Sequence, residues 1–184
     1  MQILDKLSLL INMKLKFPDY LSLIGLSLAW VSLILFIYNN PNWAIVVSLI
    51  AVLFDFFDGY FARRFHLESD FGRQVDSLID VVTYLLFSSL IFLKYLTPNL
   101  ITGAVIGALI LVFGVLRLAR FNSEGFITIK DKVYYRGLPV AHVYFVVITL
   151  YFLKSFIMWN YWFNVLILLA IFPLMISNYK VRKF

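Results

Sequence analysis

Four aspartates in the stretch LFDFFDGYFARRFHLESDFGRQVDSLIDVV, residues 53–82, have the residue type and spacing for chemistry. Asp55 and Asp58 are three residues apart and Asp76 and Asp80 four apart, so on helices each pair projects from one face. Four carboxylates gathered closely cannot all stay ionised unless cations lie among them. Such oxygen ligands suit magnesium, manganese or calcium, and two ions sharing carboxylates are a familiar arrangement for phosphoryl transfer. The spacing therefore predicts a divalent-metal site, with two ions as the expected number.

Two other interpretations of the four aspartates compete with this one. The carboxylates could pair with Arg63, Arg64 and Arg73 as ordinary interfacial charges, but their number and the small residues between them make this a weaker explanation. They could also bind ions in a cation channel or transporter, because intramembrane carboxylates mark ion pathways. Some neighbouring residues have no evident role in an ion path: Gly59, Ala62, Arg63 and Gly72. Transport is therefore the remote alternative to catalysis.

The elements that must position these aspartates are membrane helices. The 184 residues are 62% hydrophobic, with a mean hydropathy of +0.91, and apolar runs approach the length of about 20 residues that a bilayer requires. Runs such as IGALILVFGVL lack the period-two alternation of a β-barrel. The sequence therefore predicts an all-α bundle of six transmembrane helices. They are expected near residues Leu21–Tyr38, Trp43–Phe61, Val75–Leu93, Ile101–Leu118, Leu138–Leu153 and Met158–Ile176.

The charged residues predict the orientation of the bundle. Six spans put both termini on one side, and all Lys and Arg residues except Lys94 and Lys154 fall on that side, as do the ten acidic residues. The positive-inside rule makes this side cytoplasmic. We therefore expect a multi-pass protein of the cell membrane whose termini and polar chemistry face the cytoplasm. The net charge of +6 then reflects topology and attraction to anionic headgroups, and no nucleic-acid module is visible.

The N-terminal segment MQILDKLSLLINMKLKF, residues 1–17, has apolar residues at helical spacing with charges between them. This pattern predicts an amphipathic helix lying in the membrane interface. Broken apolarity and the lack of a small-residue cleavage site argue against a cleaved signal peptide. The expected organisation is an interfacial helix over residues 1–17 and one membrane domain over residues 18–184.

The chain lacks cysteine, which excludes disulfides, thiolate catalysis and zinc-thiolate sites. His66 and His142 are each isolated from a second histidine at ligand spacing, and a hard-cation carboxylate site does not require one.

The aspartates belong to a longer pattern, D-x-x-D-G-x-x-A-R followed after eight residues by G-x-x-x-D-x-x-x-D. This pattern resembles the signature of the CDP-alcohol phosphotransferases, and every signature position matches. The resemblance implies an integral membrane enzyme of about six helices that displaces CMP from a CDP-linked donor by an alcohol hydroxyl. It implies that Asp55, Asp58, Asp76 and Asp80 hold divalent metals and that Asp80 is the general base. It also implies a homodimer.

The same resemblance implies a binding site for the CDP group. Its expected residues are Asp58, Gly59, Ala62, Arg63, Gly72, Asp19 and Ser22. The small residues leave room for a nucleotide near the helix backbone, and the Arg63 guanidinium can donate paired hydrogen bonds to phosphate. The glycines could instead serve turns and close helix packing. Asp19 and Ser22, in FPDYLS, replace the polar positions of the P-N-x-x-T pattern common in the family, and Asp19 could simply cap a helix.

A second stretch concerns the acceptor alcohol. The residues RLARFN, 117–122, and the later GLP, 137–139, resemble the phosphatidylserine synthase branch of the family, although Val140 stands where the branch often has a second proline. The resemblance implies L-serine as acceptor, with Arg117, Arg120 and Asn122 as its binding residues. Glycerol 3-phosphate or inositol phosphate is the alternative acceptor, since the same arginines could bind a phosphate. They could also be positive-inside residues that snorkel. Acyl and ether lipid donors are not distinguished by these residues.

Overall fold

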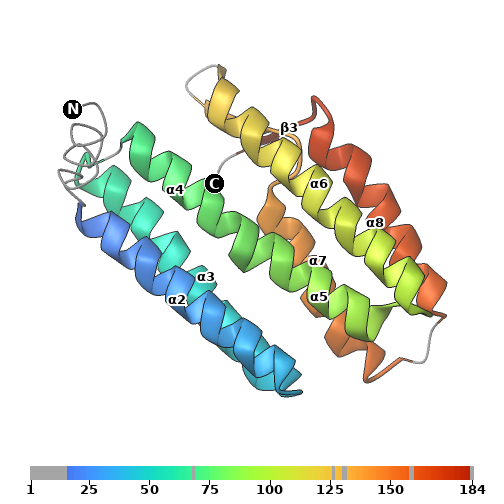
Figure 1. Ribbon diagram of the computed structural model, residues 1–184. Coiled ribbons are helices and arrows are strands. Elements are labelled where there is room, and N and C mark those ends of the chain that lie inside the picture. Colours follow the sequence, from blue (N-terminus) through green and yellow to red (C-terminus); the bar gives the residue numbers. More distant parts are fainter. Residues whose placement is uncertain (1–15, 68, 126, 130–131, 158–159, 183–184) are drawn as a thin grey trace, which may run out of the picture.

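The computed structural model describes residues 16–67, 69–125, 127–129, 132–157 and 160–182, and within them it is a bundle of long helices (Figure 1). The expected interfacial helix of residues 1–17 lies almost entirely outside the described residues, and Phe17 itself begins the first membrane helix. Six helical rods occupy the positions expected from the apolar runs. Successive rods run in opposite directions (Figure 1). One end of the bundle therefore contains the start of the first rod, the end of the second and the start of the third.

Helices α2 (Phe17–Ile37) and α3 (Pro41–Arg64) form an antiparallel hairpin (Figure 1). The turn between them suits its sequence, because Asn39 takes a positive φ of 60° and Pro41 occupies the first turn of α3, where its missing N–H is not needed. The buried Ser32 hydroxyl donates to the carbonyl of Ala44 at 2.8 Å and fastens the two helices near the turn. The hairpin thereby brings the start of α2 beside the aspartate end of α3.

The third rod is one continuous helix over Phe71–Leu96 whose backbone changes character along its length. It comprises α4 (Asp70–Asp80), the π-helical segment η1 (Val81–Leu86), α5 (Phe87–Ile91) and the π-helical segment η2 (Phe92–Leu96). Ser69 caps its start by accepting the N–H of Gly72 at 3.0 Å. The first π-helical segment begins directly after Asp80. Such segments are rare and occur often at functional sites.

The remaining rods are α6 (Leu100–Glu124), α7 (Val140–Lys154) and α8 (Tyr161–Ile176). Four rods, namely α2, α3, the third rod and α6, have 21 to 26 residues and are long and apolar enough to cross a membrane. The apolar helices α7 and α8 have 15 and 16 residues. At 1.5 Å per residue each reaches only about 22–24 Å, short of a hydrocarbon core of about 30 Å. The chain is thus a multi-pass membrane protein, and passage of these last two helices through the whole bilayer stays a prediction.

The described part of the chain is mainly helical, as expected, but it also contains a small sheet that the sequence analysis did not predict. Three short strands, β1 (Ile127–Ile129), β2 (Lys132–Arg136) and β3 (Lys180–Arg182), form an antiparallel sheet in the order β1-β2-β3. The first two follow α6, between two of the apolar runs, and they pair with Tyr134 opposite Ile127. Their residues are mostly β-branched or aromatic. A strand of three residues is too short for an alternation pattern, and β3 is joined to β2 only by tertiary pairing.

The sheet is held against the bundle at Gly137, which has a φ of +68°. A Cβ at this position would lie 2.1 Å from the carbonyl oxygen of Met175, so only glycine lets the chain pass the end of α8 so closely. Its N–H donates to the carbonyl of Tyr179 at 2.9 Å. This contact fixes the segment that leads from the sheet into α7.

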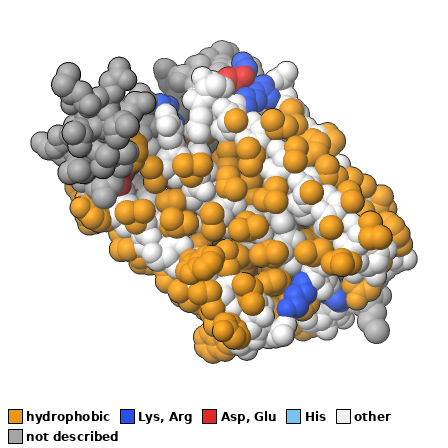
Figure 2. All heavy atoms as spheres, viewed as in Figure 1, with side chains coloured by type: hydrophobic (Ala, Val, Ile, Leu, Met, Phe, Trp, Pro, Cys, Tyr) orange, Lys and Arg blue, Asp and Glu red, His pale blue; other side chains and the backbone are white. Residues whose placement is uncertain are grey.

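Side chains are distributed as expected for a protein whose outer surface meets lipid. Hydrophobic side chains cover most of the face drawn in Figure 2, and charged ones gather toward its ends. Large apolar residues are strongly exposed, including Ile101 at 78% and Trp30 at 60%. The buried core lies between the third rod, α6, α7 and α8, around Phe87, Tyr144 and Leu168. In contrast, α2 and α3 contribute few residues to that core.

Candidate active site

Three of the four aspartates form a compact group at one end of the bundle. One carboxylate oxygen from each of Asp55, Asp76 and Asp80 lies within 4.8 Å of the other two. Asp55 comes from α3, whereas Asp76 and Asp80 are one helical turn apart on α4. Packing of the two helices therefore brings Asp55 beside Asp76 and Asp80, whereas Asp58 lies outside this group of three. Three half-buried carboxylates at this separation fit a divalent cation, which would relieve their mutual repulsion.

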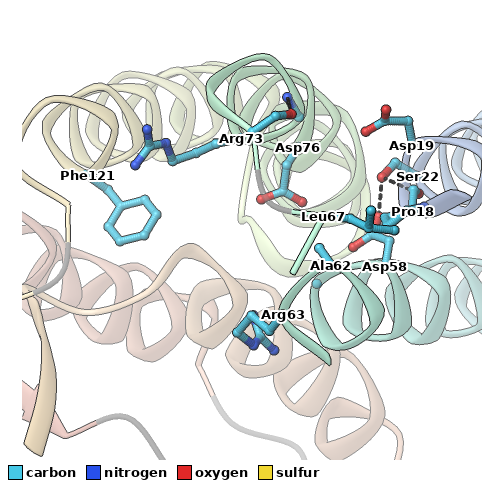
Figure 3. Close-up of a pocket in the computed structure, with 13 residues that line it drawn as sticks. Pro18, Asp19, Ser22, Asp58, Ala62, Arg63, Leu67, Arg73, Asp76 and Phe121 are labelled. Carbon is cyan, nitrogen blue, oxygen red and sulfur yellow. Dashed lines mark hydrogen bonds between the residues drawn. The ribbon is translucent and has the colours of Figure 1, made fainter. Parts of the chain in front are cut away.

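Asp58 faces a different neighbour from the other three. It is buried, with 4% of its surface exposed, and its carboxylate accepts a short hydrogen bond from the hydroxyl of Ser22 on α2. Ser22 also contacts the carbonyl of Pro18 at 3.2 Å. Figure 3 shows Asp58 on α3 and Asp76 on α4 near each other, with Ser22 of α2 beside Asp58 and joined to it by a dashed line. Asp58 is therefore bound to the first helix and faces the cavity beside the carboxylate group.

A cavity of about 550 Å³ opens beside the carboxylate group, a volume within the usual range for small-ligand sites (Figure 3). Its walls come from the start of α2, the end of α3, the start of α4 and the end of α6. All seven residues that the sequence predicted for CDP binding line it: Asp19, Ser22, Asp58, Gly59, Ala62, Arg63 and Gly72. Asp76 lines it too, so this aspartate belongs both to the carboxylate group and to the cavity wall.

The two signature glycines have specific neighbours. A Cβ on Gly59 would lie 3.3 Å from Nη1 of Arg63, one turn later on α3, so the glycine leaves space for that guanidinium against the helix. A Cβ on Gly72 would lie 3.1 Å from the Ser69 hydroxyl and 3.3 Å from Oδ1 of Asp19. Gly72 therefore also allows the starts of α2 and α4 to approach closely. Gly72 can therefore serve both close helix packing and an open cavity wall.

Asp19 combines a capping role with a place in the cavity. Its Oδ2 accepts the backbone N–H of Lys16 at 2.7 Å, at the N-cap position of α2. The helix start is thus stabilised by the Asp19 carboxylate, as the capping interpretation expected. The residue also lines the cavity and approaches Gly72 through its other oxygen. The structure therefore accommodates both interpretations of FPDYLS.

Arg117 and Arg120 differ in position although they are one turn apart on α6. Arg117 is buried, its guanidinium carbon lies 5.3 Å from the ring centroid of Phe121, and its charge acts on the carboxylate of Asp80. Phe121 in turn lines the cavity. Asn122 accepts a hydrogen bond from the Ser77 hydroxyl at 3.0 Å, which joins the end of α6 to α4 next to Asp76. Arg117 and Asn122 do not themselves line the cavity, but each contacts a residue at or next to its wall.

Arg120 points toward the end of α8. Its Nη1 donates to the carbonyl of Ile176 at 2.7 Å, and its Nη2 donates to Oδ1 of Asn178 at 2.5 Å. Its Nε forms an ion pair with Glu124 at 3.2 Å, and Glu124 also pairs with Arg136 at 2.8 Å. A cation that bonds the last carbonyls of a helix stabilises that helix end. The sequence analysis assigned both arginines to serine binding, whereas the structure directs them to different partners.

Tyr84 was missed by the sequence analysis. Its hydroxyl donates to Oδ2 of Asp55 at 2.6 Å, and the residue is 5% exposed. The spacing carried a signal, because Asp76, Asp80 and Tyr84 recur every four residues and lie along one face of the third rod. Five residues that line the cavity were also not assigned: Pro18, Leu67, Ser69, Arg73 and Phe121. They come from loop or helix-end positions whose convergence depends on the tertiary fold.

Several known proteins are similar in sequence to this chain. The chain is 32% identical over 175 residues to the archaetidylserine synthase of Methanothermobacter thermautotrophicus, covering 90% of this chain and 69% of that protein. It is 33% identical over 139 residues to a CDP-diacylglycerol--serine O-phosphatidyltransferase of Methanocaldococcus jannaschii, covering 73% of this chain and 61% of that protein.

A shorter similarity, 35% identity over 66 residues, joins the chain to a CDP-diacylglycerol--glycerol-3-phosphate 3-phosphatidyltransferase of Rickettsia bellii, with 34% of this chain and 36% of that protein covered. The profile of the CDP-alcohol phosphatidyltransferase family matches residues 15–175, which include every helix except the last residue of α8. The chain therefore belongs to the CDP-alcohol phosphatidyltransferase family.

Proposed function

We propose that this protein transfers the phosphatidyl or archaetidyl group of a CDP-linked lipid to the hydroxyl of L-serine and releases CMP. One observation carries the proposal: the seven residues that resemble the family's CDP-binding positions line a single cavity, and that cavity adjoins the carboxylates of Asp55, Asp76 and Asp80. Two relatives that cover most of this chain are named archaetidylserine synthase and CDP-diacylglycerol--serine O-phosphatidyltransferase. These names support serine as the acceptor.

In the proposed reaction, Asp55, Asp76 and Asp80 would hold a divalent ion or a pair of ions. Asp58 would be a further ligand, by resemblance to the family. Magnesium and manganese are the expected ions. The metal supplies positive charge that neutralises the pyrophosphate and stabilises charge developing on its oxygens. The carboxylates at one end of the cavity thereby define the end at which the pyrophosphate binds.

The cytidine and its phosphate lie in the cavity against the wall formed by Gly59, Ala62 and Gly72. The Arg63 guanidinium donates to a phosphate oxygen. Ser22 holds the Asp58 carboxylate in place from the neighbouring helix. Because the ends of α2, α3 and α4 all contribute residues to the cavity lining, donor binding depends on the packing of α2 against α3 and α4.

Asp80 is the proposed general base. It accepts the proton of the serine hydroxyl as the oxygen bonds to the phosphorus that carries the lipid. The bond between that phosphorus and the bridging oxygen breaks, and its electron pair leaves with CMP. Arg117, whose charge acts on Asp80, is the better placed of the two arginines to receive the serine carboxylate. The hydrogen bonds of Arg120 to the end of α8 give it a positioning role in the same proposal.

The end of the bundle that holds the cavity is proposed to face the cytoplasm. Arginines gather at this end, including Arg63, Arg73 and Arg117, whereas Lys94 and Lys154 lie at the helix ends on the other side. The positive-inside rule assigns the arginine-rich end to the cytoplasm. Serine and CMP then exchange with cytoplasmic water, and the lipid chains remain in the bilayer. A homodimer is the proposed assembly, by resemblance to the family.

The decisive experiment is CMP release by the purified full-length protein in detergent. The donor is CDP-diacylglycerol or CDP-archaeol, the ion is magnesium or manganese, and the acceptors are L-serine, glycerol 3-phosphate and inositol phosphate in separate reactions. We expect serine-dependent release that a chelator abolishes. CMP release only with a phosphorylated alcohol would show that serine is not the acceptor. It would favour the alternative acceptor glycerol 3-phosphate, which the similarity to the Rickettsia bellii protein supports. Folded protein that releases no CMP with any acceptor would contradict the transferase proposal.

A further inference from the structure

We infer that Tyr84 is a positioning residue that orients the Asp55 carboxylate for metal binding. Tyr84 lies in η1, directly after the helical segment that carries Asp76 and Asp80, and its hydroxyl donates to Oδ2 of Asp55 at 2.6 Å. The hydrogen bond therefore joins the two helices that supply the carboxylate group. The inference rests on the proposed function, because it concerns the metal on which that reaction depends.

The contact restricts the orientation of the carboxylate. Asp55 projects from the last turns of α3, and a free Asp side chain can rotate among several staggered positions. A hydroxyl that donates to one carboxylate oxygen holds the group in one orientation and leaves the other oxygen available. Outer partners of this kind orient metal-binding carboxylates, and their loss typically costs 10–100-fold in metal affinity or activity. Tyr84 has the position and the donor for this role.

Tyr84 itself packs against a second tyrosine. Its ring contacts that of Tyr144 on α7 edge-on, with centroids 5.5 Å apart. The Tyr144 hydroxyl is 2.6 Å from the hydroxyl of Ser48, and Tyr144 and Ser48 are both buried. Ser48 precedes Asp55 by seven residues, two turns of α3, so both lie on nearly the same face of that helix. The tyrosine pair therefore contacts α3 twice, once at an aspartate and once at a serine.

This arrangement offers a matched pair of variants. Tyr84→Phe and Tyr144→Phe each remove one buried hydroxyl and keep the ring, so each loses one hydrogen bond to α3. Only Tyr84→Phe removes a hydrogen bond to an aspartate. A merely structural role would make the two variants alike, whereas a positioning role separates them in metal affinity.

The test measures manganese binding directly, by loss of the electron paramagnetic resonance signal of free Mn²⁺, with full-length protein in detergent. We expect the dissociation constant of Tyr84→Phe to rise about tenfold or more, and that of Tyr144→Phe to change less than about twofold. Without metal, the thermal unfolding midpoints of the two variants should fall by similar amounts. In the CMP-release assay, added Mn²⁺ should restore much of the turnover of Tyr84→Phe, with the KM for serine unchanged.

Equal Mn²⁺ affinity in wild type and Tyr84→Phe, or equal losses in the two variants, would overturn the inference. So would wild-type protein that binds no Mn²⁺, or a Tyr84→Phe protein that cannot be purified as a monodisperse species, because either result removes the positioning role. If the wild type binds Mn²⁺ but releases no CMP, the proposed function fails while the comparison of affinities still decides the role of Tyr84.

Discussion

The Ser22 hydroxyl on α2 donates a hydrogen bond to the carboxylate of Asp58 on α3, and both residues are buried beside the cavity. A membrane hairpin whose two helices otherwise contribute little to the core is thereby joined at its functional end. Ser22 stands where the family pattern has a different polar residue, yet it reaches an aspartate of the signature. The contact makes the first helix part of the site and not only a membrane anchor.

Ser22→Ala removes the donor and leaves Asp58 without this hydrogen bond. We expect the KM for the CDP-lipid to rise about tenfold or more while the KM for serine changes little, because the cost of a lost hydrogen bond to a charged group is about 1.5–3 kcal/mol and about 1.4 kcal/mol is tenfold. Steady-state CMP release with each substrate varied in turn measures both constants. Ser27→Ala is the matched control, since the exposed Ser27 hydroxyl donates only to Leu23 in its own helix. A rise in both constants, or the same change in the control, would contradict a donor-side role.

Gly59→Ala introduces a methyl group 3.3 Å from Nη1 of Arg63. The guanidinium must shift, so we expect weaker donor binding and a higher KM for the CDP-lipid, although alanine has the higher helix propensity. Gly107→Ala on α6 is the control, because its new Cβ would meet Ser89 at 3.5 Å, an ordinary contact. Titration of CDP-lipid by calorimetry checks the affinities of the two variants. Unchanged affinity in Gly59→Ala would separate Arg63 from donor binding.

Asp80→Asn keeps the size of the side chain and removes its proton-accepting carboxylate. We expect turnover to fall by about 10²–10⁴-fold, the usual contribution of general base catalysis, with additional loss from a weakened metal site. Binding of the CDP-lipid should persist, because the cavity residues are unchanged. Near-normal turnover at saturating metal would refute the assignment of Asp80 as base.

Arg117→Ala and Arg120→Ala are expected to differ. Arg117 acts on Asp80 and packs on Phe121, so its loss should raise the KM for serine much more than that for the CDP-lipid. Loss of Arg120 should instead lower the thermal unfolding midpoint, because the end of α8 loses its hydrogen bonds. The KM for serine, the KM for the CDP-lipid and the thermal unfolding midpoint should be measured for each variant. A selective effect of Arg120→Ala on serine, with unchanged stability, would restore the serine-binding role expected from the sequence.

Metal addition should stabilise the folded protein. If Asp55, Asp76 and Asp80 bind a divalent ion only when the protein is folded, excess Mn²⁺ raises the thermal unfolding midpoint. At a Mn²⁺ concentration of 100 times the dissociation constant, the free energy of unfolding rises by about 2.7 kcal/mol. The Asp76→Asn variant should show a smaller rise, whereas Gly107→Ala should respond like the wild type. Equal stabilisation of the Asp76→Asn protein would place the ion elsewhere.

Much of the architecture was predictable because lipid imposes a strong rule on sequence: apolar runs long enough to hold every backbone hydrogen bond within the segment become helices. The six rods were located in this way, and the spacing within each aspartate pair predicted a shared helical face. The three short strands were missed because strands of three to five residues carry too little alternation, and β3 joins the sheet from a segment far along the chain.

The sequence by itself determined the residue types of the site, the faces on which the aspartates lie and the family to which the chain belongs. Only the tertiary structure decided which carboxylates meet, because Asp55 joins Asp76 and Asp80 while Asp58 contacts Ser22. It also gave Arg117 and Arg120 different partners and brought Tyr84 to Asp55. The physical reason is that a helical face is set by local periodicity, whereas the partner opposite that face depends on how the helices pack.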